Sequence, residues 1–593
     1  MMLKDRQMLA AAAAFILGIV IFALGWRWGA AALIVASAAA IAFRLVWVIR
    51  PIRIRDASVL LIRLAGELRE VESATLVQQV LGRFSPSFRQ MLAALDFCGR
   101  DAKVKTVLVE ITGLNVGFAM AQEMGELLRG LYERGKRVIV LLNGDTVSLR
   151  EYLVAAGAGE IVVNPNVSLT MVGLAAGGLF LKRALDKLQI EAQTLQWKEY
   201  KGAAETFIRE KMSPALREST ESLIKDWEEI LIARLSAWRG FEADHARRLI
   251  NSGFLGAQAA LKAGLVDRIG YFEDLEGELD PDGRGKPLAP LPAYLRRVRY
   301  LSRTGRAARI ALIYGVGPVI TGDPVAGEFI SGEELAGMLH LASTDRRIAA
   351  ILLRISSPGG SAVGSDLVWR AVNQARRREK PVIVSMGDVA ASGGYYIASA
   401  ADAIVAGPGT VSGSIGVIYA KFNLGALLDR LGVSFDFVKT TEAGDALSIA
   451  RALHADELEQ LNELMGSLYR NFTTKVAQGR RLSDAQTEEV ARGRVWSGVA
   501  AKSRGLVDEL GGLQRAIEIA REKAGLAIGE PHQLVLVHPP GLRLRTGPRL
   551  PRRFDAEQEP ALLSRALASW GVWAPALVKL AVGRAPLWLC PFF

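Results

Sequence analysis

Residues 382–388 read VIVSMGD, and almost the same stretch, VIVLLNGD, occupies residues 138–145. The next landmark, DAIVAGP at 402–408, is likewise an echo of GEIVVNP at 159–165. The members of each pair end 243 residues apart. Because two independent landmarks keep the same separation, the sequence indicates a duplicated unit, and this duplication decides the fold.

A third pair of similar segments precedes these landmarks. VLVEIT at 107–112 and ILLRIS at 351–356 are short aliphatic and β-branched runs that are typical of buried strands. Helical patterns with apolar residues at three- and four-residue steps follow at 121–134 and 365–378. Strands that alternate with helices predict right-handed βαβ units and mainly parallel sheets. We therefore expect two tandem α/β domains.

Composition changes along the chain predict its division into five parts. They are a membrane anchor at 1–55, a first α/β repeat at 56–272, a linker at 273–306, a second α/β repeat at 307–540, and a tail at 541–593. The linker is rich in Asp, Glu, Gly and Pro. The tail is first basic and then aromatic and apolar, which suits either an element docked on anionic lipid or a helix packed on the body or on a partner.

The N-terminus predicts an integral membrane protein. Met8–Trp26 and Gly29–Ile49 are apolar runs, the second interrupted only by Arg44, and each approaches the ~20 residues that a spanning helix needs. A buried soluble hairpin is the weaker alternative. If both runs cross the bilayer, the positive-inside rule leaves both chain ends in the cytoplasm, whereas a single crossing exports everything that follows it.

Charge and cysteine content narrow the possible partners. The chain has 593 residues and a formal net charge of +12, but no Lys/Arg stripe interleaved with aromatics, so nucleic acid is not an expected partner. Membrane lipid is the expected anionic surface. Two cysteines, Cys98 and Cys590, provide neither a disulfide framework nor a metal-ligand pattern. We expect no metal and no cofactor.

The two copies differ most in the loops that follow matching strands, where α/β proteins place their sites. In the second copy, SSPGGS at 356–361 could turn backbone N–H groups into a cleft, although an ordinary tight turn is the simpler interpretation. Ser392 stands at a strand-to-helix junction among small residues, and its counterpart in the first copy is Leu149. Ser392 is either a nucleophile or the N-cap of the helix.

A serine nucleophile needs a base, and none of the five histidines lies near a glycine-rich loop. A lysine can serve if burial lowers its pKa from ~10.4 to near neutrality. The best candidate is Lys201, which is followed by small residues and whose counterpart in the second copy is Gly444. Lys439 is the second candidate. The serine and the lysine would then come from different copies.

Four motifs together resemble the signal peptide peptidase A family in its long, tandem-domain form, a family of Ser/Lys-dyad proteases. The motifs are AASGGYY at 390–396, YKGAAETF at 200–207, SSPGGS at 356–361 and SGSIGV at 412–417. The resemblance covers residues from about 56 to 540. It implies two domains of the crotonase and Clp-protease type, with a dyad that closes between the repeats.

Carried onto these positions, the resemblance assigns a role to each motif. Ser392 would be the nucleophile and Lys201 the general base. Ser414 would hold the lysine ammonium group. The oxyanion hole would consist of the amide of Gly393 and that of either Gly359 or Gly360.

The resemblance also implies a setting and a partner. We expect a serine endopeptidase of the bacterial inner membrane that degrades cleaved signal peptides and other apolar peptides, assembled as a bowl-shaped homotetramer. Family precedent places the catalytic body on the periplasmic side, whereas two spanning segments would place it in the cytoplasm. The second apolar run and the aromatic tail depart from the family pattern. The alternatives are a crotonase-like acyl-thioester enzyme and a non-catalytic membrane scaffold.

Overall fold

The computed structural model describes residues 58–71, 86–280, 288–301, 308–322, 329–527 and 532–537, which form two compact units. Unit 1 holds the described residues of Met1–Gly117, Ala121–Val172 and Arg234–Arg306. Unit 2 holds those of Phe118–Met120, Gly173–Ala233 and Ala307–Phe593. A segment of the first sequence repeat, residues 173–233, therefore packs with the second repeat.

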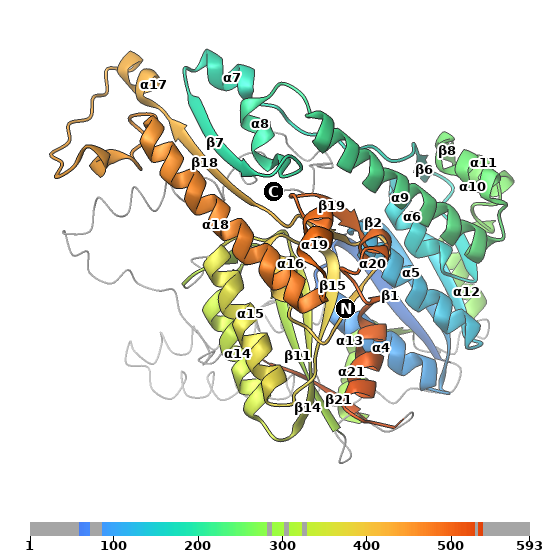
Figure 1. The fold of residues 1–593 in the computed structure, drawn as a ribbon. Helices are drawn as coiled ribbons and strands as arrows, with labels where there is room; N and C mark the ends of the chain where they lie inside the picture. The colour runs from blue at the N-terminus through green and yellow to red at the C-terminus, as the bar shows by residue number, and fades with distance from the viewer. Residues whose placement is uncertain are drawn as a thin grey trace, which may run out of the picture. The chain divides into compact units, whose positions relative to one another are not determined.

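Unit 1 contains a parallel six-stranded sheet in the order β10-β1-β2-β3-β5-β9. Figure 1 labels two of its strands, β1 and β2. Its strands are β1 (Ser58–Glu67), β2 (Val104–Asn115), β3 (Arg137–Leu142), β5 (Glu160–Val163), β9 (Arg268–Ile269) and β10 (Ala289–Pro290). A small second sheet joins β4 (Thr146–Ser148), β6 (Ser168–Met171) and β8 (Gly253–Gly256). The helices are α4 (Phe88–Arg100), α5 (Phe118–Glu133), α6 (Leu149–Ala156), α10 (Ala243–Ile250), α11 (Ala257–Lys262), α12 (Phe272–Leu279) and α13 (Leu291–Leu301).

The main sheet of unit 2 follows the order β19-β17-β15-β14-β11-β21; β16 also pairs with β15, and β20 pairs with β16. In this sheet only β17 and β19 pair antiparallel. Its strands are β11 (Ala308–Val316), β14 (Ile348–Ser357), β15 (Val382–Ala391), β16 (Ala403–Ala406), β17 (Val411–Gly413), β19 (Val495–Ser497), β20 (Glu509–Leu510) and β21 (His532–Leu536). Two separate pairs are β12 (Val319–Ile320) with β13 (Ile330–Ser331), and β7 (Glu191–Trp197) with β18 (Val417–Asn423). The prediction of parallel α/β units is confirmed.

The helices of unit 2 include the long α18 (Ala455–Arg480). The others are α7 (Lys182–Lys187), α8 (Glu205–Ile208), α14 (Gly332–Thr344), α15 (Ala362–Arg377), α16 (Gly393–Ala398), α17 (Gly425–Arg430), α19 (Asp484–Val490), α20 (Gly498–Ser503) and α21 (Leu513–Lys523), with the 3₁₀ turns η1 (Gly202–Ala204) and η2 (Glu442–Asp445). Two helices have residues in both units: α5, whose first three residues belong to unit 2, and α9 (Pro214–Arg239).

The two repeats use the same local hydrogen bonds. The Ile161 amide donates to the Asp267 carboxylate at 2.8 Å, and the Ile404 amide donates to that of Asp508 at 2.7 Å. Each of these carboxylates also pairs with an arginine near the end of a 26-residue helix, α9 in one copy and α18 in the other. The duplication in the sequence is therefore a duplication of structure.

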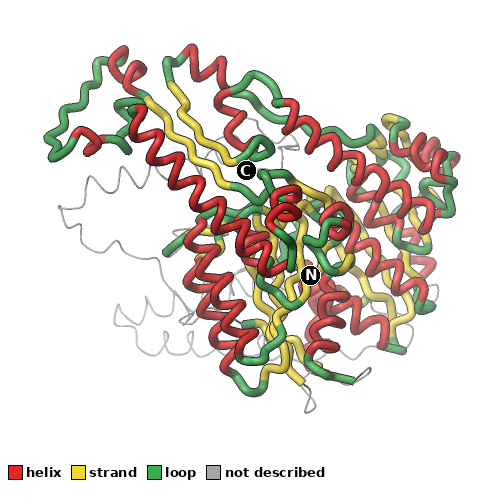
Figure 2. The backbone as a smooth tube through the Cα atoms, in the orientation of Figure 1, coloured by secondary structure: helices red, strands yellow, loops and turns green. Residues whose placement is uncertain are grey.

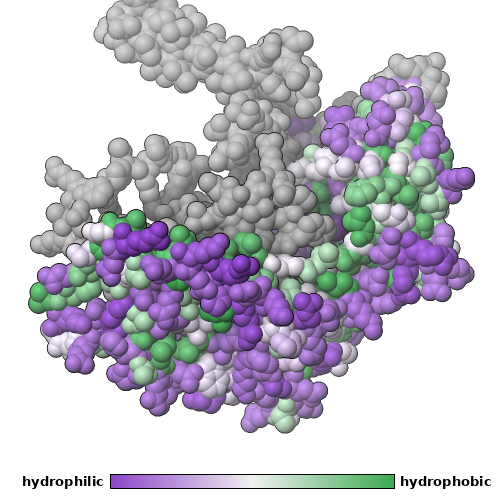
Figure 3. Space-filling view, turned by 90° about the horizontal axis from the view of Figure 1, so that it is seen from above, coloured by the Kyte–Doolittle hydropathy of each residue, from purple (hydrophilic) through white to green (hydrophobic). Residues whose placement is uncertain are grey.

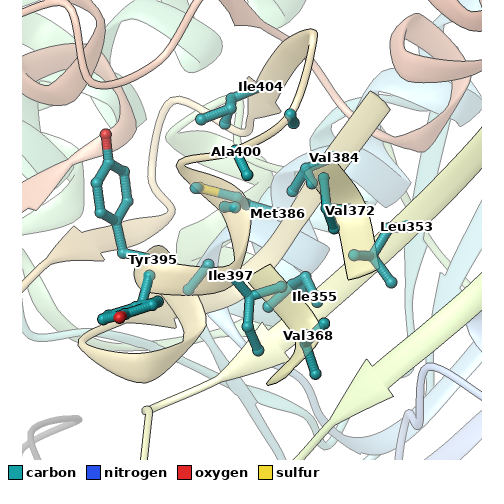
Figure 4. Packing of buried hydrophobic residues seen from close by; sticks show 14 of the residues in the cluster. Leu353, Ile355, Val368, Val372, Val384, Met386, Tyr395, Ile397, Ala400 and Ile404 are labelled. Carbon is teal, nitrogen blue, oxygen red and sulfur yellow. The ribbon is translucent and has the colours of Figure 1, made fainter. Parts of the chain in front are cut away.

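The core of unit 2 includes buried residues of α15, α16, β14 and β15. Figure 4 shows several of them packed together. Val368 and Val372 are four residues apart on α15 and are both fully buried, because this spacing puts them on one face of the helix. They pack in one cluster with Leu353 of β14 and Val384 of β15. This packing fixes the end of β15, where Ser392 follows.

Hydrophobic residues on the surface occur in separate patches on a mainly hydrophilic face (Figure 3). Within the described part of the chain, no helix has the length and apolar character needed to cross a bilayer. The two apolar runs of the predicted anchor (1–55) and the tail (541–593) lie outside the described residues. The range predicted as a linker, 273–306, includes most of α12 and all of α13, both of them in unit 1.

Candidate active site

Ser392 lies between β15 and α16 in a strained backbone conformation. Its φ of 53° and ψ of −119° fall outside the regions that L-residues favour, which costs about 1–3 kcal/mol. Its amide donates to Gly413 O at 2.8 Å, and its carbonyl accepts a hydrogen bond from the Tyr396 amide at 2.8 Å. These two backbone hydrogen bonds hold the turn in place. Its side chain makes no cap hydrogen bond to the helix. Ser392 occupies the N-cap position without acting as a cap, so the hydroxyl is available.

Two glycines make this turn possible. A Cβ atom on Gly393 would lie 2.5 Å from Ser365 Oγ, and one on Gly394 would lie 2.8 Å from Ser357 O. Both distances are shorter than any real Cβ contact, so side chains are excluded at these positions. The glycines after Ser392 are therefore required by close packing.

Lys201 reaches the serine from the segment that follows β7. Its Nζ atom lies 3.0 Å from Ser392 Oγ, 2.7 Å from Ser414 O and 2.8 Å from Ser414 Oγ. The side chain is only 6% exposed, and burial lowers the pKa of Lys201 to about 7. No carboxylate among the described residues forms an ion pair with this amine. An amine that is largely neutral above pH 7 thus contacts a serine hydroxyl.

An antiparallel strand pair carries the lysine to the serine. β7 pairs with β18 over seven residues, from Glu191 opposite Asn423 to Trp197 opposite Val417, and Figure 2 shows the two strands side by side. β18 begins three residues after Ser414, and Lys201 lies four residues after the end of β7. The pairing thus fixes Lys201 against Ser414, and all of these residues belong to unit 2.

Two further glycines, which are not among the predicted site residues, pack directly against Lys201. A Cβ on Gly493 would lie 2.5 Å from Lys201 N, and one on Gly416 would lie 3.2 Å from Lys201 Cδ. The Tyr200 amide also donates to Arg492 O at 3.2 Å. Gly416 falls within the SGSIGV motif, which could have identified it. Gly493 has no signal in the sequence, because its contact joins segments almost 300 residues apart.

The glycine loop before α15 lies against the serine. A Cβ on Gly359 would lie 2.7 Å from both Ser392 Cβ and Gly393 N, and Gly359 has a left-handed φ of 106°. The Gly359 amide donates to Ser357 Oγ at 3.2 Å. Among the described residues, the amides of Gly360 and Gly393 have no hydrogen-bond acceptor. These two N–H groups, and not that of Gly359, are available for a developing negative charge.

The other lysine candidate lies elsewhere. Lys439 Nζ is 3.0 Å from Asp445 Oδ1 in an exposed loop and donates to Glu442 O at 3.2 Å. The structure therefore brings together Lys201, Ser392, Ser414 and the glycine loop, but leaves Lys439 in a surface ion pair. Among the described residues, no group of three or more His, Cys, Asp or Glu side chains could hold a metal ion.

Comparison with known proteins gives a consistent result. The model of "Peptidase family S49" matches the chain twice, at residues 131–282 and 374–527, which together make up more than half of it. The chain is 30% identical over 504 residues to the serine protease SPPA, chloroplastic, of Arabidopsis thaliana, with 83% of this chain and 73% of that protein covered.

Two bacterial proteins, both named Protease 4, are also similar. The one from Salmonella typhi is 34% identical over 416 residues, with 68% of this chain and 66% of that protein covered. The one from Haemophilus influenzae is 29% identical, with 78% of each chain covered. The chain therefore belongs to peptidase family S49 and is a serine protease.

Proposed function

We propose that Ser392 and Lys201 form the catalytic dyad of this protease, which cleaves apolar peptides at a membrane. The observation that carries the proposal is the 3.0 Å contact between the buried Lys201 amine and the Ser392 hydroxyl. A general base must lie within hydrogen-bond reach of the proton that it removes and have a pKa near the working pH. Lys201 meets both requirements, since burial lowers its pKa to about 7.

In the first half-reaction, Ser392 Oγ attacks the carbonyl carbon of the scissile peptide bond while neutral Lys201 accepts the hydroxyl proton. The carbonyl electrons move onto oxygen, and the Gly360 and Gly393 amides donate hydrogen bonds to the resulting oxyanion. The intermediate then collapses, the C–N bond breaks, and the Lys201 ammonium group gives its proton to the leaving amine. The products are a free amine and an ester on Ser392.

In the second half-reaction, Lys201 takes a proton from water as the water oxygen attacks the ester carbonyl. The tetrahedral intermediate collapses to a carboxylic acid, and the proton on Lys201 returns to Ser392 Oγ. Ser414 positions the amine throughout, because its hydroxyl and carbonyl oxygens both accept hydrogen bonds from Nζ. Because no carboxylate of the described residues pairs with Nζ, the ammonium form gains no ion-pair stabilisation there, and the amine is mostly deprotonated only above its pKa of about 7.

The substrate class and the setting follow from the sequence and from the family. We propose signal-peptide remnants and other extended apolar peptides as substrates, because the chain begins with apolar runs suited to a bilayer. A relative from Enterococcus faecium, 32% identical over 182 residues, is named a putative signal peptide peptidase SppA. The proposal includes anchoring in the bacterial inner membrane, a catalytic body on its outer side, two crotonase-type domains and a homotetramer.

The contact between Lys201 and Ser392 argues against both alternative functions. A carboxylate facing the loop at Gly359, with Lys201 far away, would favour a crotonase-like thioester enzyme, whereas Lys201 is in contact with Ser392. A scaffold would have no use for a strained serine beside a buried amine. Membership of a peptidase family argues against both.

Single substitutions in the full chain test the dyad. Ser392→Ala and Lys201→Ala should each lower kcat/KM on a fluorogenic apolar peptide by at least ~10³-fold, because loss of a nucleophile or of its base removes the covalent pathway. Lys439→Ala is the matched control and should retain wild-type activity, since this lysine pairs with Asp445 on the surface. An active Lys201→Ala beside an inactive Lys439→Ala would assign the base to Lys439 and overturn the proposal.

A further inference from the structure

The strand pair that carries Lys201 has an unused counterpart elsewhere in the duplicated chain. Advancing β7 (191–197) by the repeat distance of 243 gives residues 434–440, and moving β18 (417–423) back by the same distance gives residues 174–180. Both of these segments belong to unit 2. The chain therefore contains two copies of each strand position but only one pair, β7 of the first copy with β18 of the second.

The structure supports this equivalence at three points around the segments. Helices α7 and α17 are 243 residues apart at both ends. The Leu181 amide donates to Thr206 O and the Leu424 amide donates to Ile449 O, both at 2.7 Å, and donors and acceptors again differ by 243. Left-handed backbone ends both helical segments, at Gln189 (φ 57°) and at Gly432 (φ 75°). The flanks of the two unused segments thus fold like the flanks of the paired strands.

Residues 434–440, which we call the arm, carry the features of an unpaired strand. Phe435, Phe437 and Val438 are 46%, 42% and 106% exposed. The rings of Phe435 and Phe437 stack with a 2° interplanar angle, as side chains two residues apart do on one face of an extended segment. Among the described residues, no backbone hydrogen bond joins the arm to the rest of the chain.

The complementary segment, residues 174–180, is similarly exposed. It reads LAAGGLF, and Leu179 is 43% exposed. Apart from a single bridge residue at Gly177 it forms no strand in the described structure. Backbone that lies outside any regular strand, next to exposed apolar side chains, is a template for strand addition from another chain.

We propose that the arm of one copy of this protein pairs antiparallel with residues 174–180 of a second copy, in the register that β7 and β18 use within the chain. The β7–β18 register places Gln196 opposite Ile418 and Leu195 opposite Tyr419. Moving each strand by the repeat distance places Lys439 opposite Ala175 and Val438 opposite Ala176. The partner is a second copy because this chain already holds the same pairing once.

The pairing has a consequence for assembly. It joins two different segments, so each copy gives an arm on one side and receives one on the other, which is a heterologous contact. Such contacts repeat from copy to copy and close into a ring when the rotation allows. The homotetramer of the proposed function would be a ring closed by four of these pairs. The dyad itself lies within one chain and needs no partner.

Disulfide trapping tests the register. The test uses the whole chain in detergent, in a Cys590→Ser background that removes one of its two native cysteines. In this background the double variants Ala175→Cys/Lys439→Cys and Ala176→Cys/Val438→Cys place cysteines directly opposite each other in the proposed register. One of two neighbouring pairs is a non-hydrogen-bonded pair with close Cβ atoms, so at least one variant should give a ladder of covalent multimers on a non-reducing gel. The matched control, Ala176→Cys/Phe437→Cys, is one residue out of register and should remain a single chain.

A second measurement uses the native mass. Phe437→Asp should convert the multimer to single chains, whereas Phe254→Asp, at a phenylalanine that is 76% exposed in unit 1, should leave the mass unchanged. Both variants should keep peptide hydrolysis, because Ser392 and Lys201 meet within one chain. An internal disulfide in a monomer would assign the arm to its own chain. The proposal would also be overturned by a multimer that survives Phe437→Asp and yields no ladder. Trapping in a Ser392→Ala background separates this result from any failure of the proposed catalysis.

Discussion

The two copies of the repeat solve the same strand-to-helix turn in opposite ways. In the first copy, Ser148 caps α6 in the ordinary manner, with its side chain accepting the Glu151 amide at 3.3 Å while Glu151 accepts the Ser148 amide at 2.7 Å. In the second copy the chain turns at Ser392 with a positive φ, and no side chain caps α16. One turn is a stable helix start, and the other is a strained loop that exposes a hydroxyl.

The difference extends to the neighbouring loop. Glu151 Oε1 accepts the Leu114 amide at 2.7 Å. The positions equivalent to Glu151 and Leu114 in the second copy are Gly394 and Ser357, where a Cβ on the glycine would already lie 2.8 Å from Ser357 O. The first copy therefore has a hydrogen-bonding carboxylate at this position, and the second copy has a glycine without a side chain. The comparison teaches that the turn at Ser392 differs from the capped turn of the first copy by the absence of side chains and by a strained backbone, which leave the hydroxyl free of a capping role.

Importing the first copy's residue into the second should have the largest effect. Gly394→Glu forces the Ser357 carbonyl away and displaces the glycine loop, so we expect kcat/KM to fall by about 10³-fold, as when an oxyanion donor is lost. The peptide assay, with circular dichroism to confirm folding, measures this. The matched control is Gly277→Glu on α12, where a Cβ meets open space. A folded Gly394→Glu enzyme with normal activity would show that the bare position is incidental.

The pH dependence tests the lysine that only the first copy supplies. Burial lowers the pKa of Lys201 to about 7, so below that pH the amine is an ammonium group that cannot accept the serine proton. We expect kcat/KM to fall about tenfold per pH unit below pH 7 and to level off above it. A rate profile of the wild-type enzyme between pH 5 and 9 measures this. A rate that stays constant across this range would exclude Lys201 as the base.

The smallest expected effect comes from the structural turn of the first copy. Glu151→Gln replaces one acceptor oxygen by an amide donor and leaves a backbone N–H of Ser148 or Leu114 without its partner, which costs about 1–3 kcal/mol of unfolding free energy. Urea unfolding measures this, and peptide hydrolysis at low urea should be unchanged. Glu133→Gln, at an exposed i,i+4 pair with Arg129, should change stability by less than about 0.5 kcal/mol. Loss of catalysis in Glu151→Gln would mean that the first turn has a role in the reaction.

Much of the site was accessible from the sequence because it lies where the two repeats differ. The 243-residue offset showed that only the second copy has a serine at the position of Ser392 and only the first copy has a lysine at the position of Lys201. The offset also paired the strands correctly, since strand periodicity and landmark residues are local signals. The sequence could not show whether the Gly359 or the Gly360 amide is free for the oxyanion hole, because this depends on the hydrogen bond from the Gly359 amide to Ser357 Oγ.

Other features depended on contacts between distant segments. Nothing in EAQTLQW at 191–197 shows that it will pair with β18, since only the three-dimensional fold brings these segments together. For the same reason the packing of residues 173–233 with the second repeat was not visible. Gly493 is required by the Lys201 backbone, a contact that no local pattern encodes.

The distance along the chain between Lys201 and Ser392 has a consequence for biosynthesis. The amine precedes the hydroxyl by 191 residues, and Ser414, which holds the amine, emerges later still. A nascent chain on the ribosome therefore carries the Lys201 amine without its serine hydroxyl until Ser392 and Ser414 of the second repeat have been synthesised. On the proposed mechanism, any product released early, or cut between the repeats, would be unable to hydrolyse its neighbours, so the order of synthesis protects the cell from a half-made protease.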